Sequence, residues 1–282
     1  MVHVDEMNIC DRPVSAYKNS DKSGRILIWW LGQAGFLIKC GEYNILIDPY
    51  LSDALAKKYQ GTAFPHIRLM SPPIATEALT SIHAILCTHA HSDHMDPEIF
   101  PVLLENNPDI KIVIPASAFE TAISRGATKE NIILLNHGDH LNLLPGISLE
   151  AVASAHESIE TNQSGEHLYL GYMLNYHGYV IYHSGDNCPY DGLLNNLRQK
   201  QIDIAMLPVN GRGKGVKGNF TFNEAVDIVR KSNIPILIVH HFGMFDFNTV
   251  PLEALKKYQN QYSDEKCHIF VPEVNKTFEI NR

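Results

Sequence analysis

Short apolar runs separated by glycines follow an irregular stretch at the start of the chain. Residues 26–31, 36–39 and 43–48 are rich in β-branched, aromatic and other apolar side chains, with glycines between them. This pattern predicts antiparallel strands joined by tight turns. Residues 1–24 show no clear periodicity, and we expect them to form an N-terminal arm or a peripheral strand and loop.

Strands and helices alternate along the rest of the chain, after a proline-containing excursion over residues 52–80. Apolar runs predict further strands near residues 82–88, 111–114, 131–135, 147–153, 168–176, 179–183, 202–207 and 236–240. Helices are predicted over residues 97–104, 116–125, 222–232 and 252–262. Asp96 before Pro97 is typical of a helix N-cap, and Thr221 with Glu224 has capping-box spacing. Strands followed by helices, twice, indicate an α/β fold with two sheets flanked by helices, in one domain over residues 25–282.

Composition places the chain among globular proteins, with 282 residues, 45% of them apolar and 19% charged. No apolar run approaches the roughly 20 residues of a membrane span, and the N-terminus lacks a signal-peptide pattern. We therefore expect a cytoplasmic protein that does not bind membranes. The five cysteines are scattered without a CxxC pair, which argues against disulfides and a structural zinc knot. A net charge of −8 disfavours nucleic-acid binding.

The strongest chemical signal is an HxHxDH pattern between a predicted buried strand and a predicted helix. It consists of His89, His91, Asp93 and His94, and by composition such a pattern arises by chance in roughly one of 500 sequences like this. His89 and His91 project to the same side of an extended segment, while Asp93 and His94 reach a neighbouring position. Two adjacent cations can be held in this way. Imidazole and carboxylate suit zinc, manganese or iron and leave a position open for water.

One loop cannot complete two coordination shells, so further ligands are expected at the ends of other strands. His156, Asp186 and His241 each follow a predicted strand, and they are the candidates. His167 is the alternative to His156. Asp48 also follows a strand, and we predict that it orients a metal-binding histidine from outside the ligand shell, a simple turn cap being the alternative.

These residues resemble the metallo-β-lactamase superfamily over about residues 26–262, where HxHxDH is followed by a histidine, a bridging aspartate and a last histidine. The segments Trp29-Trp30-Leu31-Gly32-Gln33-Ala34-Gly35, Leu46-Ile47-Asp48-Pro49-Tyr50 and Tyr182-His183-Ser184-Gly185-Asp186, with the pair His240-His241, look most like the branch that contains L-ascorbate-6-phosphate lactonase. The resemblance implies a four-layer αββα sandwich of two mixed β-sheets flanked by helices.

The resemblance also implies how the ligands divide between two metal ions, zinc or manganese. One ion would be held by His89, His91 and His156, the other by Asp93, His94 and His241, with Asp186 bridging them. Asp93 and His240 are predicted as catalytic residues, although His240 fits a core histidine as well. Arg212, Lys214 or Lys217 in the glycine-rich segment 211–218 is predicted to bind an anionic substrate, with a flexible loop as the alternative.

The predicted activity is hydrolysis of a small phosphorylated lactone or ester by a metal-bridging hydroxide. A phosphodiesterase or phospholipase D-like hydrolase is the alternative, because residues 241–245 also resemble the terminal motif of N-acyl-phosphatidylethanolamine phospholipase D. A non-catalytic metal-binding protein is a third reading, disfavoured because every expected ligand position is filled. The sequence leaves open the physiological substrate, the metal and whether the protein is a homo-oligomer.

Overall fold

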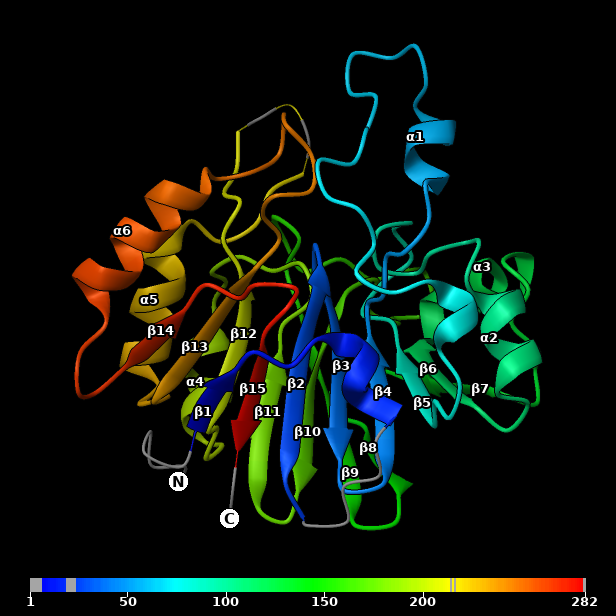
Figure 1. Cartoon of the computed structure of the whole chain (residues 1–282), viewed down its shortest axis with the longest axis horizontal. Helices are drawn as coiled ribbons and strands as arrows, with labels where there is room; N and C mark the ends of the chain where they lie inside the picture. The colour runs from blue at the N-terminus through cyan, green and yellow to red at the C-terminus, as the bar shows by residue number, and fades with distance from the viewer. Residues whose placement is uncertain (1–6, 19–23, 214, 216, 281–282) are drawn as a thin grey trace. The chain divides into compact units, whose positions relative to one another are not determined.

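Two mixed β-sheets carry the residues described by this computed structural model, namely 7–18, 24–213, 215 and 217–280. Each sheet belongs to one of two compact units (Figure 1). Among the described residues, the N-terminal unit comprises those within 7–135, 244–247 and 273–280, and the C-terminal unit comprises those within 136–243 and 248–272. Two mixed sheets flanked by helices confirm the predicted α/β fold class. A single domain over residues 25–282 stays a prediction.

The sheet of the N-terminal unit combines an antiparallel half with a parallel half. In spatial order its strands are β1 (Met7–Cys10), β15 (Thr277–Ile280), β2 (Ile26–Gly32), β3 (Gly35–Cys40), β4 (Tyr43–Ile47), β5 (Ala84–Leu86), β6 (Lys111–Pro115) and β7 (Ile132–Leu135). Pairing is antiparallel from β1 to β4 and parallel from β4 to β7. All seven residues of β2 are buried, which explains why it reads as a continuous apolar run rather than an alternating one.

The helices of the N-terminal unit are short and lie in the connections between strands. They are α1 (Ala54–Lys58), α2 (Phe100–Asn106) and α3 (Phe119–Ser124), with 3-10 turns at Val14–Lys18, Thr76–Ala78 and Ala116–Ala118. Phe100 of α2 packs into one buried apolar cluster with Trp29 of β2 and Ile85 of β5. This cluster is the core of the unit.

The sheet of the C-terminal unit has the same mixed character. Its strands in spatial order are β14 (His268–Phe270), β13 (Ile236–His240), β12 (Ile204–Pro208), β11 (Tyr179–His183), β10 (Leu170–Tyr176), β9 (Ile147–Ala153) and β8 (His140–Leu144). The strands from β8 to β11 are antiparallel, and those from β11 to β14 are parallel.

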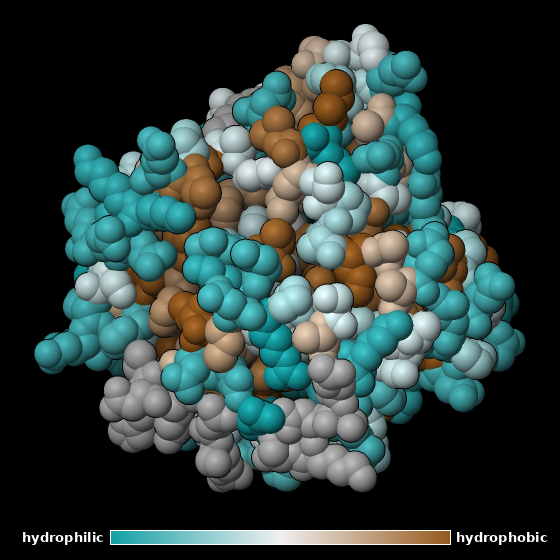
Figure 2. Space-filling view, viewed as in Figure 1, coloured by the Kyte–Doolittle hydropathy of each residue, from teal (hydrophilic) through white to brown (hydrophobic). Residues whose placement is uncertain are grey.

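The described part of the C-terminal unit contains the helices α4 (Leu193–Arg198), α5 (Phe222–Lys231) and α6 (Leu252–Tyr262). The helices α5 and α6 contact β12, β13 and β14, and they lie beside these strands in Figure 1. The predicted capping box of Thr221 and Glu224 is present at the start of α5. Hydrophilic residues cover α6 in Figure 2, and its buried side chain is Leu255.

One predicted helix start is wrong. The helix α2 begins at Phe100, after Ile99 as its N-cap residue, and not after Asp96. The Asp96 carboxylate instead accepts hydrogen bonds from the backbone N–H groups of Leu51 and Ser52, at 3.0 and 2.9 Å, and from that of Glu98 at 3.0 Å. Asp96 therefore ties two loops together, a use that its sequence neighbours do not reveal.

The strands and helices that the sequence analysis missed are short. They are β8, β14, β15, α1 and α4, whereas β1 is a peripheral strand of the kind expected for the first 24 residues. In β8, only Leu143 is buried, so its apolar pattern is weak. Within the described ranges, no helix combines the length and apolar character needed to cross a membrane.

Acid is expected to destabilise the N-terminal unit partly through His83. Burial lowers the pKa of His83 below its ordinary 6.5, an effect that Lys39 adds to and Glu42 opposes. Its Nδ1 accepts a hydrogen bond from the N–H of Asn44 at 3.1 Å, which requires an unprotonated Nδ1. Because the folded pKa is the lower one, the neutral ring's contribution to stability is present above the unfolded pKa and lost as the pH falls through the folded pKa.

The free energy of unfolding of His83→Gln should therefore fall less between about pH 7.5 and about pH 5.5 than that of the wild type. Denaturant titrations at the two pH values measure the free energy of unfolding. Taking the difference between the two pH values within each protein removes the pH-independent cost of the substitution. Equal pH dependence in the two proteins would exclude His83 as a contributor.

Candidate metal centre

In the N-terminal unit, the HxHxDH segment directly follows the buried strand β5. The neighbouring strand β4 runs parallel to β5 and is followed by Asp48, whose N–H donates to the carbonyl of Leu86 at 2.9 Å. Parallel strands end at the same edge of a sheet, so Asp48 and the residues after β5 lie together there. The side chains of four residues after β5 form the first donor set, which consists of His89, His91, Asp93 and His94.

Asp48 holds one histidine of this set in a defined orientation. Its fully buried carboxylate accepts a hydrogen bond from Nδ1 of His94 at 2.7 Å. It also accepts the N–H and the hydroxyl of Thr88 at 2.7 and 2.6 Å, and Oγ1 of Thr88 lies 3.0 Å from Nδ1 of His89. Because Nδ1 of His94 carries its proton toward Asp48, Nε2 offers a lone pair, as a metal ligand requires.

The four donors of the first set are packed closely. The ring of His89 lies 4.6 Å from that of His91 and 4.0 Å from that of His94, measured between centroids. Oδ2 of Asp93 lies 3.7 Å from Nε2 of His94. The same oxygen accepts a hydrogen bond from the amide of Gln33 at 2.9 Å. Gln33 thereby orients the Asp93 carboxylate toward the histidines.

The C-terminal unit contributes a second donor set from the ends of three strands. His156 follows β9, Asp186 follows β11 and His241 follows β13, and the pairings of this sheet make all three strands run in one direction. The hydroxyl of Ser154 donates to the carbonyl of Ser184 at 2.7 Å, which ties the first two strand ends together. The second set is therefore assembled at one edge of the sheet.

Asp186 lies between the two histidines of the second set. Its Oδ2 is 3.6 Å from Nε2 of His156, and its Oδ1 is 3.3 Å from Nε2 of His241. Nδ1 of His156 donates to the carbonyl of Gly218 at 3.0 Å, which leaves Nε2 toward the carboxylate. All three side chains of the set are buried. One carboxylate that presents a different oxygen to each of two imidazoles suits a bridging ligand.

The backbone of His241 supports a functional reading of this strand end. Its φ is +62°, in the left-handed region that residues other than glycine seldom adopt. Such strain is concentrated at sites where the direction of a side chain matters.

The chemistry of both donor sets fits a divalent metal. All seven predicted ligands are among the described residues whose donor atoms could hold an ion. Imidazoles combined with carboxylates, with Nδ1 of His94 and of His156 each engaged in a hydrogen bond, match the ligands of zinc, manganese and iron.

The other predicted site residues have different surroundings. His240 is fully buried and stacks on His183, with ring centroids 4.7 Å apart and planes at 7°. Arg212 donates to the carbonyl of Asn219 at 2.7 Å and forms an ion pair with Glu224. Lys214 lies outside the described residues. The catalytic role of His240 and the substrate-binding roles of Arg212 and Lys214 stay predictions.

The alternative ligand His167 lies beside two other polar residues. Its Nδ1 is 2.8 Å from Oδ1 of Asn136, and its ring makes an edge contact with His137 at 5.4 Å. Burial, and then the charge of His137, lower the pKa of His167. Nε2 of His156 lies 3.6 Å from Oδ2 of Asp186, and His156 therefore stays the candidate ligand.

Three residues around the donor sets were missed by the sequence analysis, namely Gln33, Thr88 and Gly218. Gln33 is a buried amide in the turn between the apolar strands β2 and β3, and a polar residue in such a place is a usable signal. Thr88 adjoins the first histidine and is recognisable by that position. Gly218 acts through its carbonyl oxygen, which has no signature in the sequence.

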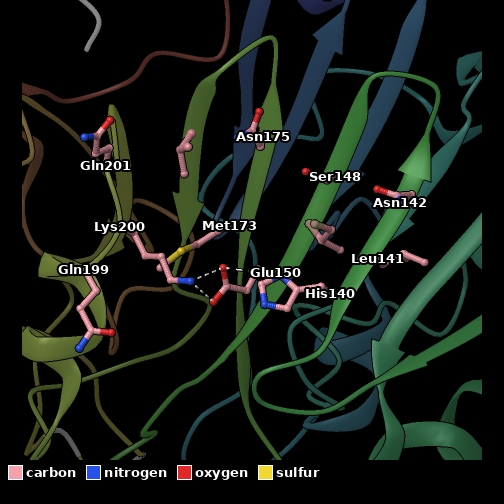
Figure 3. Close-up of a pocket in the computed structure, with 12 residues that line it drawn as sticks. His140, Leu141, Asn142, Ser148, Glu150, Met173, Asn175, Gln199, Lys200 and Gln201 are labelled. Atoms are coloured by element: carbon pink, nitrogen blue, oxygen red, sulfur yellow. Dashed lines mark hydrogen bonds and ion pairs between the residues drawn. The ribbon is translucent and has the colours of Figure 1, made fainter.

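A pocket of about 470 Å³ lies elsewhere in the C-terminal unit, against β8, β9 and β10 (Figure 3). Leu149 and Met173 line it, together with an ion pair in which Nζ of Lys200 is 2.7 and 2.8 Å from the two oxygens of Glu150. None of the predicted metal ligands lines this pocket.

Comparison with known proteins identifies the family. Residues 43–242 match the beta-lactamase superfamily domain. The Probable L-ascorbate-6-phosphate lactonase UlaG of Escherichia fergusonii is 22% identical over 260 residues, which cover 82% of this chain and 73% of the relative.

Solved structures share the fold at low sequence identity. Isothiocyanate hydrolase from Delia radicum gut bacteria is 18% identical with a TM-score of 0.71, covering 89% of this chain and 97% of its own. Igni18, a metallo hydrolase from Ignicoccus hospitalis, is 15% identical with a TM-score of 0.68, covering 92% and 99%. The predicted metallo-β-lactamase fold is confirmed. Because the family match spans most of its length, the chain belongs to the beta-lactamase superfamily, as predicted, and is a hydrolase.

Proposed function

We propose that the protein hydrolyses a small anionic lactone or ester and that its two donor sets act together as one binuclear metal centre. The observation that carries the proposal is the position of Asp186, with one carboxylate oxygen toward His156 and the other toward His241. In the proposed centre His89, His91 and His156 hold one ion, Asp93, His94 and His241 hold the other, and Asp186 is shared. When bound, two divalent ions supply an ionised water near neutral pH and polarise the substrate oxygen.

The surrounding residues keep the donors in place in this proposal. Asp48 fixes the ring of His94, and the Gly218 carbonyl fixes that of His156. Outer hydrogen bonds of this kind set the tautomer of a metal-binding histidine and make it a better ligand. Gln33 holds the carboxylate of Asp93. We propose that this carboxylate takes up the proton that the attacking water releases and passes it to the leaving oxygen of the substrate.

A phosphorylated lactone is the substrate class that we propose first. The support is the similarity to a relative named as an L-ascorbate-6-phosphate lactonase. Arg212 and Lys217 are engaged by Glu224 and Glu160, so Lys214 is the member of the glycine-rich segment that we propose for the substrate anion.

Metal analysis combined with a substrate panel tests the proposal. The purified protein should contain two zinc or manganese ions per chain, lose them to a chelator and regain activity when either metal is restored. The panel comprises sugar-phosphate lactones, carboxylic esters, an isothiocyanate and bis(p-nitrophenyl) phosphate. We expect metal-dependent opening of the lactones. Phosphodiester cleavage without lactone hydrolysis would replace the proposed class with a phosphodiesterase, and absence of metal-dependent turnover across the panel would refute it.

A further inference from the structure

The last residue of the glycine-rich segment 211–218 is hydrogen-bonded to the proposed metal ligand His156. This last residue, Gly218, is held on both sides of its backbone by two consecutive residues. The N–H of Gly218 donates to Oε1 of Glu157 at 3.2 Å, and its carbonyl accepts from Nδ1 of His156 at 3.0 Å. The orientation of the His156 ring therefore depends on where this segment lies.

Lys217 is connected to the same imidazole through a second path. Its Nζ is 2.5 Å from Oε1 of Glu160 and donates to the hydroxyl of Tyr169 at 3.1 Å. The ring of Tyr169 makes an edge contact with that of His156, with centroids 5.3 Å apart and planes at 68°. His156 is thus contacted by the backbone of the residue after Lys217 and by the aromatic ring that Lys217 bonds.

The start of the segment also restrains its end. A Cβ atom added at Gly218 would meet Cα of Arg212 at 2.5 Å, so the two backbones cross with no room for a side chain. Arg212 is itself fixed by the carbonyl of Asn219 and by Glu224, which belongs to the capping box of α5. Both ends of the segment are therefore anchored, the first at Arg212 and the second at Gly218.

We propose that Lys217 is a positioning residue for His156, acting through Gly218 and Tyr169 on the direction of its metal-binding nitrogen. This inference rests on the proposed function, in which His156 is a ligand. The Lys217 side chain is 40% exposed and that of Glu160 is 34% exposed, and ion pairs this accessible contribute little to folding stability. A role in positioning therefore predicts weaker metal binding without a matching loss of stability.

The chain offers a matched control in Lys200, which forms the ion pair with Glu150 in the same unit (Figure 3). Its side chain is 36% exposed, and the pocket that Lys200 and Glu150 both line has no proposed ligand among its lining residues. Lys217→Met and Lys200→Met each remove one charged lysine from one surface ion pair and keep the length of the side chain.

Metal affinity measured by competition with a chromophoric chelator separates the two variants. Lys217→Met should bind one of its two Zn²⁺ ions roughly tenfold more weakly, at the lower end of the cost of losing an outer partner. The absorption spectrum of the Co²⁺ form of Lys217→Met should differ from that of the wild type. Its melting temperature should stay near that of Lys200→Met. Lys217→Arg should restore part of the affinity, because it keeps the charge.

Tyr169→Phe gives a second readout that preserves the ring against His156 and removes only the hydroxyl. Tyr169→Phe should lower the affinity for the same ion that Lys217→Met binds more weakly. This readout is available whether or not Lys217→Met folds well. If Lys217→Met and Tyr169→Phe bind both ions as tightly as Lys200→Met, the inference is wrong while the proposed function stands. If the wild type binds no ion, the proposed function itself fails.

Discussion

Asp186→Asn is expected to lose at least one of the two metal ions and to lower the kcat/KM of metal-dependent hydrolysis by more than about 100-fold, the upper end of the cost of an outer-shell change. The two oxygens of Asp186 lie 3.6 and 3.3 Å from the Nε2 atoms of His156 and His241. Asparagine replaces one oxygen with an NH₂ group, which donates hydrogen bonds and carries no lone pair for a metal. It also removes the negative charge that a shared cationic site requires.

Metal content and activity should be measured beside Asp203→Asn. Asp203 is also buried in the C-terminal unit, and its Oδ2 accepts the N–H of Val180 at 2.9 Å. An asparagine oxygen can make that bond as well, so this variant should keep both ions. An Asp186→Asn protein that retains two ions and nearly full activity would remove Asp186 from the proposed centre.

Trp29→Ala is expected to destabilise the N-terminal unit by about 3 to 5 kcal/mol. Trp29 is fully buried in the cluster that contains Ile85 and Phe100, so alanine leaves a cavity that the surrounding side chains fill only in part. The indole N–H also donates to the carbonyl of Arg12 at 2.9 Å. The variant loses this hydrogen bond together with the apolar contacts.

Denaturant unfolding followed by tryptophan fluorescence measures the loss of stability of the N-terminal unit. The chain has two tryptophans, Trp29 and Trp30, and both lie in the N-terminal unit, so Trp30 remains as the probe. The metal-free protein should be used, because an ion that binds only the folded state adds to the apparent stability. Trp29→Phe keeps an aromatic ring and should lose less. A cost below about 1 kcal/mol for Trp29→Ala would contradict its assigned place in the core.

The sequence predicted the parts of the fold that have a strong local pattern. The continuous apolar runs of β2 and β13 and the capping box before α5 were found close to their observed bounds. The weakly apolar strand β8 was missed, because one buried leucine produces no periodicity. The start of α2 was misplaced because Asp96 bonds Leu51 and Ser52, and no local rule reports a partner so distant in the sequence.

The candidate donors were predictable because they follow strands whose ends meet at one edge of a sheet. His89 and its predicted orienting partner Asp48 in one unit, and Asp186 and His241 in the other, illustrate this rule. The partners of the glycine-rich segment were not predictable. Whether Arg212 contacts a ligand or Glu224 depends on side chains that the chain brings together only after folding.

In the proposed metal centre, the second donor set would also set the point during synthesis at which a cation can be held between its ligands. His156, Asp186 and His241 follow β9, β11 and β13, so a ribosome must deliver the chain past His241 before Asp186 can have both imidazoles as neighbours. Before then, the same histidines are separate, weak ligands on a growing polypeptide. Since metal binding and folding are coupled wherever the site does not exist in the unfolded chain, cation retention would distinguish complete C-terminal sheets from fragments that end before β13.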